Sequence, residues 1–145
     1  MPLEQLLGYQ LRRAWLAIGS DLGQRLEPLG LTGMSLSVLL MIKTNPGVSQ
    51  SELAREMSIK RANMTPLTAQ FAERGWVERI ATDGRSHGLR LTPAGKVLTD
   101  LAWQAVQANE RKFLECLAED DRTSVHRILR ALRSGADTVH GARDG

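Results

Sequence analysis

The chain has a single cysteine, Cys116, among its 145 residues, and aromatic residues make up only 4% of it. One cysteine excludes an intramolecular disulfide framework and is typical of a reducing compartment. No apolar run approaches the roughly 20 residues that a membrane-spanning helix needs. The first five residues lack the basic region and apolar segment of a secretory signal. We therefore expect a cytoplasmic protein with no membrane partner.

The sequence also lacks the spacings that carry enzyme or metal chemistry. It has no glycine-rich phosphate-binding loop, no nucleophile motif with a partnering base, and no histidine pair at metal-ligand spacing. His87, His126 and His140 are scattered and have no cysteine nearby in sequence, so a structural zinc site is not expected. We expect neither an enzyme nor a protein that holds a metal or another cofactor.

The basic charge of the chain is concentrated in one segment. The net charge is +3 and the pI is near 9.5, which is compatible with nucleic-acid binding without establishing it. From position 58 to position 90, six basic residues stand against three acidic ones, so this segment alone carries an excess equal to that of the whole chain. The length suits one ordinary domain whose core needs no disulfide or metal.

Two helices are predicted in the first third of the chain. Apolar residues at spacings of three and four indicate a first helix over about residues 3–27, with a stop at 28–30. Thr32 is a suitable N-cap for a second, heavily apolar helix through Lys43. The turn-forming residues 45–47 should end it.

A helix-turn-helix is predicted next. Ser49 and Glu52 have the S-x-x-E spacing of a capping box, which begins a third helix. A turn near residue 58 leads to a fourth helix over 61–74, with Gly75 placed to end it. Pro66 lies inside this helix and removes one backbone N–H, so a bend in its first turns is expected.

A hairpin and two more helices complete the expected fold. Residues 76–82 and 89–91 predict two strands joined by the basic loop 83–88, which forms a wing. Thr92 and Pro93 begin a long fifth helix through about residue 117. A final helix begins at Asp120 or Asp121, and the tail should fray from about residue 138.

The expected fold class is mainly α with a small β-hairpin wing. It is a winged helix-turn-helix with N- and C-terminal dimerisation helices, because the first, fifth and sixth helices carry more apolar surface than a small winged domain can cover. Residues 31–92 would form the DNA-binding region of this single domain, and residues 1–30 and 93–138 the dimerisation helices. A helix-turn-helix followed by a basic hairpin suits a helix in the major groove of DNA and a loop in the neighbouring minor groove.

Over nearly its whole length the chain resembles the multiple-antibiotic-resistance regulator (MarR) family of winged-helix transcription factors. The resemblance rests on the segments LGYQLRRA (7–14), LGLT (29–32), SELA (51–54), ERGWVER (73–79) and above all DGRSHGLRLTPAG (83–95). It implies a homodimeric, ligand-responsive transcriptional regulator, most often a repressor, that binds a pseudo-palindromic operator in double-stranded DNA.

The resemblance also implies which residues meet DNA. Arg85 at the wing tip would enter the minor groove, where arginine suits the enhanced negative potential, and Asp83 would hold the wing in place. The recognition helix would begin at Arg61, with Asn63 suited to adenine and Arg61 to guanine or phosphate. Lys60 stands where the family often has a small capping residue, and we expect it to contact phosphate. The expected DNA-contacting residues are Lys60, Arg61, Asn63, Thr65, Thr68, Asp83, Arg85, Ser86 and His87, with Ala62 beside them.

A small-molecule effector is implied as well, because members of the family commonly bind phenolic or other aromatic acids between the dimerisation helices and the winged domain. The effector would be an aromatic acid or its coenzyme A thioester, whose carboxylate or phosphate an arginine can pair with. In the alternative interpretation, Arg12 and Arg13 form intersubunit salt bridges and Met41 belongs to the core. The candidate ligand-binding residues are Tyr9, Arg12, Arg13, Trp15, Leu16, Ser37, Met41 and Trp103.

Other functions stay open. A non-sensing architectural DNA-binding protein would need no effector, and an RNA-binding winged helix would bind single strands equally well. A redox-sensing regulator would use Cys116, since some relatives sense peroxides through a cysteine near the start of the first helix, where this chain has none. We expect Cys116 on a buried face of the fifth helix, where a thiol is usually inert packing. Arg61, Asn63, Asp83 and Arg85 could also be ordinary surface residues.

Overall fold

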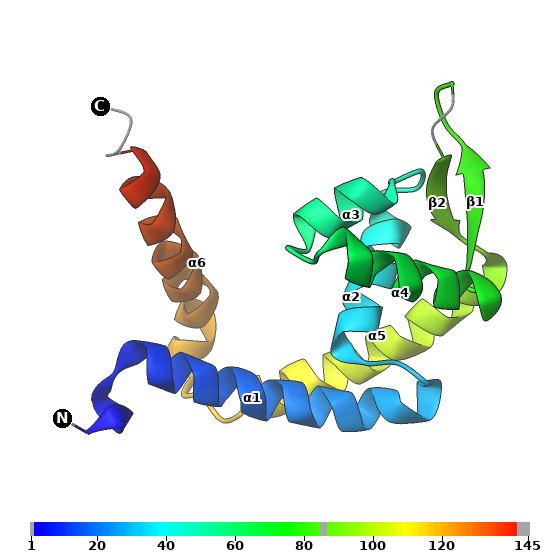
Figure 1. Ribbon diagram of the computed structural model, residues 1–145. Coiled ribbons are helices and arrows are strands. Elements are labelled where there is room, and N and C mark those ends of the chain that lie inside the picture. Colours follow the sequence, from blue (N-terminus) through cyan, green and yellow to red (C-terminus); the bar gives the residue numbers. More distant parts are fainter. Residues whose placement is uncertain (1, 85–86, 142–145) are drawn as a thin grey trace. The chain divides into compact units, whose positions relative to one another are not determined.

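The computed structural model describes residues 2–84 and 87–141, with side chains as far as residue 136. The chain divides into two compact units, Met1–Gln107 and Ala108–Gly145. The first unit holds α1 (Leu7–Leu26), α2 (Gly33–Thr44), α3 (Gln50–Glu56), α4 (Arg61–Glu73) and the hairpin of β1 (Val77–Ala81) and β2 (His87–Leu91) (Figure 1). The helix α5 (Pro93–Leu114) begins in this unit and ends in the second, which also contains α6 (Glu119–Gly141).

The predicted starts of α2, α3 and α5 and the strand pair are confirmed. Thr32 accepts a hydrogen bond from the N–H of Ser35 at 3.1 Å, and Thr92 accepts one from Gly95 at 3.0 Å. Ser49 and Glu52 form both bonds of the capping box, at 3.1 and 3.3 Å. These caps depend only on residues within one helical turn, which is why the sequence showed them.

The core of the first unit lies among α2, α3, α4 and the hairpin. It includes Phe71 and Met64 of α4, which are almost wholly buried and pack the recognition helix onto the rest. The last turn of α1 adds Leu26, which is fully buried, and α5 adds Ala102. The helix α4 runs through Pro66 without a break and ends at Glu73, and Gly75 follows it with a φ of +78°, which suits glycine.

The hairpin is joined by its backbone to the turn between α2 and α3. Its strands are antiparallel, with Arg79 opposite Leu89. Leu89 also forms a bridge to that turn, because its N–H donates to the carbonyl of Val48 and its carbonyl accepts from Gly47, both at 2.8 Å. At Gly88 the two backbones are so close that a Cβ would overlap the carbonyl of Gly47. The base of the wing is therefore held against the helix-turn-helix.

Arg74 ties the end of α4 to the loop between α1 and α2. Its guanidinium donates to the carbonyl of Gly30 at 3.1 Å and lies 5.0 Å from the ring centroid of Trp76. Gly30 itself has a φ of +71° and ends the short helical turn that follows α1. One side chain thus links the loop that follows the first helix to the end of the fourth.

Some sequence expectations about the ends of helices are wrong. A separate 3-10 turn at Leu3–Gln5 precedes α1, so the first helix begins later than expected, at Leu7. In the second unit α5 ends at Leu114, and α6 begins at Glu119 and continues to Gly141, beyond the expected end near residue 138. Nε of Arg122 donates to the carbonyls of Leu114 and Leu117 at 2.9 and 3.0 Å, so a residue of the next helix supports the turn after α5.

The expectation that Cys116 is buried on the fifth helix is also wrong. The residue is exposed, and it lies in the turn between α5 and α6 because α5 ends before it. Its thiol lies 3.4 Å from the carbonyl of Lys112, one turn earlier.

Large apolar side chains are exposed mainly on α1, α5 and α6. Trp15 on α1 is 72% exposed, which is far more than an aromatic residue of a folded core would be. Within the described part of the chain, no single helix is long and apolar enough to span a membrane. Taken together, Leu7–Leu29 and Gly33–Thr44 have the length and composition of a span, but the two helices are bent by 73° relative to each other. The other exposed apolar residues include Leu7, Leu11, Leu16 and Ile18 on α1, Leu101 and Trp103 on α5, and Ile128, Leu129 and Leu132 on α6.

Gly88→Ala should lower the free energy of unfolding by about 1–3 kcal/mol, because the added Cβ must push β2 away from the Gly47 carbonyl. Urea denaturation followed by circular dichroism, at one protein concentration, measures this. Gly33→Ala is the control, because nothing lies within 4 Å of a Cβ at that position. The control should lose no stability, and equal losses in both variants would contradict the close contact.

Candidate DNA interface

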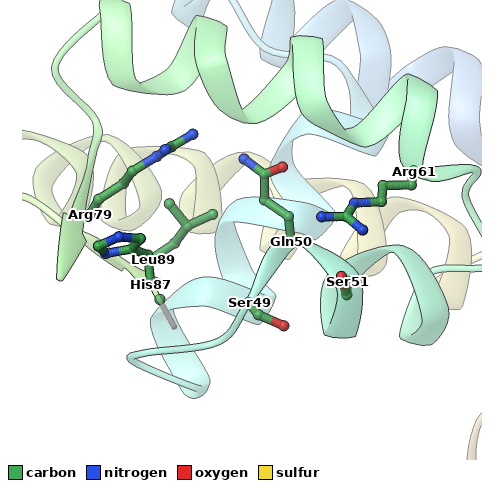
Figure 2. Close-up of a pocket in the computed structure, with 8 residues that line it drawn as sticks. Ser49, Gln50, Ser51, Arg61, Arg79, His87 and Leu89 are labelled. Atoms are coloured by element: carbon green, nitrogen blue, oxygen red, sulfur yellow. The ribbon is translucent and has the colours of Figure 1, made fainter. Parts of the chain in front are cut away.

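A basic groove joins the start of the recognition helix to the wing. It has a volume of about 280 Å³ and receives side chains from the start of α3, the start of α4 and both strands of the hairpin. Figure 2 shows Gln50 between Arg61, at the first position of α4, and Arg79 on β1, with His87 beside Leu89 on β2. The lining residues are Ser49, Gln50, Ser51, Arg61, Arg79, His87, Gly88 and Leu89.

The start of α4 attracts anions. Lys60 occupies the N-cap position, and no side chain caps the helix there. The positive end of the helix dipole therefore lies beside Lys60 and Arg61, a combination that suits a phosphate group. Lys60, Arg61, Ala62, Asn63 and Thr65 are all exposed, as expected for residues that meet a ligand outside the protein.

Arg79 enters the groove because of the alternation of a strand. On one face of the hairpin, Arg90 and Glu78 lie opposite each other and form an ion pair of 2.6 Å. Arg79, the next residue, is on the other face, opposite Leu89, and lines the groove. Arg79 was not among the DNA-contacting residues expected from the sequence, although the alternation of side chains along the predicted strand could have placed it on the opposite face from Glu78.

Thr68 does not face outward, so the expectation that it contacts DNA is wrong. Its side chain is 2% exposed, and its hydroxyl accepts from Nε2 of Gln50 at 2.9 Å and donates to the carbonyl of Thr65 at 3.1 Å. Thr68 lies one turn after Met64 and one before Phe71, on the side of α4 that packs against the core. Gln50, which is not among the residues expected from the sequence, connects α3 to Thr68.

The structure describes only part of the wing tip. Asp83 is exposed, and Gly84 has a φ of +64°, a left-handed conformation that suits glycine in a turn. Arg85 and Ser86, both expected at the DNA, lie outside the described residues. His87 begins β2 and is exposed at the groove.

The candidate ligand residues differ in their exposure and in their hydrogen bonds. The guanidinium of Arg13 donates to the Tyr9 hydroxyl at 3.1 Å, and Arg12 is exposed on the same helix. Trp15, Leu16 and Trp103 are exposed, whereas the Ser37 hydroxyl donates to its own helix at the carbonyl of Gly33.

Met41 is half-buried and lines a hollow of about 560 Å³ with Glu52 and Glu56, whose charge suits an anionic ligand poorly.

Known proteins share both the sequence pattern and this geometry. Residues 29–86 match the profile of the MarR family. The HTH-type transcriptional repressor Rv2887 of Mycobacterium tuberculosis is 32% identical over 130 residues, which cover 88% of this chain and 94% of that protein. The transcriptional repressor CouR bound to a 23-mer DNA duplex has a TM-score of 0.83 at 34% identity, over 90% of this chain and 94% of that one. CouR bound to p-coumaroyl-CoA has a TM-score of 0.80 at 32% identity, over the same shares.

These similarities extend over most of both chains and include the helix-turn-helix, the hairpin and the flanking helices. They exceed what a common fold alone requires, because about a third of the aligned residues are identical. The chain therefore belongs to the MarR family of transcriptional regulators.

Proposed function

We propose that the protein is a homodimeric transcriptional repressor that binds a pseudo-palindromic duplex and releases it when a small aromatic effector binds. The observation that carries the proposal is the groove that brings Arg61 of α4 and Arg79 of the hairpin to one basic surface. The CouR structures support it, since that relative was solved both with a DNA duplex and with p-coumaroyl-CoA.

In the proposed complex, α4 enters the major groove and the groove of Figure 2 receives the adjoining phosphates. Arg61 and Asn63 read base edges, whereas Lys60, Arg79 and His87 contact the sugar–phosphate backbone. Arg85 enters the minor groove, supported by Asp83 and Ser86. Residues 31–92 thus form the DNA-binding region, and the helices outside it the dimer.

The exposed apolar side chains of α1, α5 and α6 support the homodimer. Leu11 and Trp15 on α1, and Ile128 and Leu132 on α6, are too large and too exposed for a stable single chain. A second copy would cover them, and a two-fold axis would place two recognition helices about 34 Å apart, one turn of DNA.

The effector would act on the first helix and the signal would pass to the fourth. Arg12 and Arg13 offer charge to a carboxylate or to the phosphates of a coenzyme A thioester, near the exposed aromatic surface of Trp15. Arg74 offers the route, because it connects Gly30, after α1, with the end of α4. Ligand and DNA then compete if the distance between the two copies of α4 differs between the ligand-bound dimer and the DNA-bound dimer.

Arg79→Ala should weaken binding to a duplex that the full-length protein has selected from random sequence. It should also lower the slope of log affinity against log salt by about 1 per subunit, because one phosphate contact is lost. Arg90→Ala removes the same charge from the same hairpin, but this arginine is paired with Glu78 on the opposite face. Fluorescence anisotropy at several salt concentrations measures both slopes. An equal fall in both would mean that only net charge matters.

Ile128→Glu with Leu132→Glu should convert the dimer to a monomer, because two carboxylates cannot be desolvated in an apolar interface. Sedimentation velocity gives the mass, and the monomer should lose most of its affinity for the full duplex. Thr123→Glu adds a carboxylate to the opposite side of the same helix and should leave the dimer intact. A double variant that remains dimeric would place the interface elsewhere.

Arg12→Ala and Arg13→Ala should reduce the release of DNA by the effector while leaving ligand-free affinity nearly unchanged. Release by the effector corresponds to a loss of affinity of about 5- to 150-fold for a coupling of roughly 1–3 kcal/mol. The probes are p-coumarate, p-coumaroyl-CoA and free coenzyme A, titrated into the labelled complex.

Arg25→Ala is the control for this titration, since Arg25 lies near the other end of α1 and is paired with Asp21 at 2.7 Å. If both variants respond as the parent does, the two arginines are structural. If no aromatic acid or thioester releases DNA, the protein is a non-sensing DNA-binding protein. Equal affinity for single strands would favour the RNA-binding alternative.

A further inference from the structure

The side chain of Gln50 bridges two threonines of the recognition helix. Its Nε2 donates to the Thr68 hydroxyl at 2.9 Å, and its Oε1 accepts from the Thr65 hydroxyl at 3.2 Å. Thr68 is buried and Gln50 is half-buried, whereas Thr65 is exposed. The amide of Gln50 is therefore anchored to the buried Thr68 and in turn holds the exposed Thr65.

The single hydroxyl proton of Thr65 is committed within the protein. Besides its bond to Gln50, the hydroxyl donates to the carbonyl of Arg61 at 3.1 Å, one turn earlier in the helix. A threonine Cβ carries only one hydroxyl and one methyl group, and its χ1 is restricted by the branch. Because the proton is shared between two protein acceptors, the hydroxyl is not available to donate to an acceptor on a base edge, whereas the methyl group of this exposed residue forms no polar contact.

We propose that Thr65 reads the C5 methyl group of a thymine in the major groove by apolar contact, and that Gln50 is the residue that positions it. The inference rests on the proposed function, in which α4 lies in the major groove. Threonine in general can bond to several base edges or pack on the thymine methyl. Here the hydrogen bonds to Gln50 and to the Arg61 carbonyl take up the hydroxyl proton, which disfavours donation to a base and favours the second mode.

The direct test removes only the methyl group from the DNA. Full-length dimer selects a duplex from random sequence, and each thymine of both half-sites is then replaced in turn by uracil. At one symmetric position, the parent protein should bind the uracil duplex about fourfold more weakly per half-site, the value of one buried methyl group. Anisotropy titrations at fixed salt give the ratio of the two affinities.

Two substitutions at Thr65 separate its methyl from its hydroxyl. Thr65→Ser keeps the hydroxyl and removes the methyl, so it should bind the thymine and uracil duplexes equally. Thr65→Val keeps a methyl and removes the hydroxyl, so it should retain the preference for thymine. A preference retained in Thr65→Ser and lost in Thr65→Val would mean that the hydroxyl is the reading group, which would overturn the proposal.

A combined variant tests the positioning role of Gln50. Gln50→Met has similar length but cannot hold the Thr65 hydroxyl, so the ratio between thymine and uracil should fall toward one. In the Thr65→Val background, Gln50→Met should leave the ratio unchanged, because there is no hydroxyl to orient. A merely structural role of Gln50 would change the ratio in both backgrounds. Ser51→Ala, at a groove residue that no bond connects to Thr65, should change it in neither.

Failure of this inference differs from failure of the proposed function. Specific duplex binding by the parent with a ratio of one at every thymine would overturn the methyl contact and leave the regulator intact. Failure to select any duplex would overturn both, because a base-reading residue requires a specific complex. Circular dichroism of each variant ensures that the compared proteins are folded.

Discussion

The backbone bridge between the hairpin and the turn after α2 is the constraint on which the DNA surface depends. Leu89 exchanges two hydrogen bonds of 2.8 Å with Gly47 and Val48, and the absence of a Cβ at Gly88 permits that approach. Since α3 begins directly after this turn, the bridge sets the distance between the hairpin and the helix-turn-helix. Without it, Arg79 and Arg61 would belong to two independent surfaces instead of one groove.

The same groove combines elements that are stabilised in different ways. The recognition helix is held by burial, because Met64 and Phe71 lie in the core. Arg79 and His87 are held by the hairpin register, and the start of α3 by its capping box. Burial of large side chains contributes roughly 1.5–3 kcal/mol each, more than a net hydrogen bond of about 0.5–1.5 kcal/mol. Burial also supports the hairpin, because Val77, Leu89 and Leu91 lie in the same core, so apolar packing holds both sides of the groove.

The parts of the fold that the sequence predicted are those set by local chemistry. The caps at Thr32, Ser49 and Thr92 each involve residues within one turn, and the hairpin is marked by its strands and glycines. The errors have two origins. The turn after α5 involves a residue of the next helix, because Arg122 donates to the carbonyl of Leu114, and Cys116 is exposed in that turn. Thr68 stands four residues after Met64 and three before Phe71, so the period of α4 already placed it on the buried face, and its polar side chain misled the expectation.

Arg74 illustrates why a regulator of this kind can respond to modest binding energies. Its hydrogen bond to the carbonyl of Gly30 joins the loop after α1 to the end of α4, and its position over the nearby Trp76 helps to orient the guanidinium. A net hydrogen bond of this kind is worth about 0.5–1.5 kcal/mol. Allosteric couplings are typically about 1–3 kcal/mol, so gaining or losing this one linkage is of the size that a ligand-driven change in DNA affinity requires. In the proposed mechanism the core of the winged region need not repack, because a shift of α1 that carries Gly30 with it already changes what holds the recognition helix at its far end.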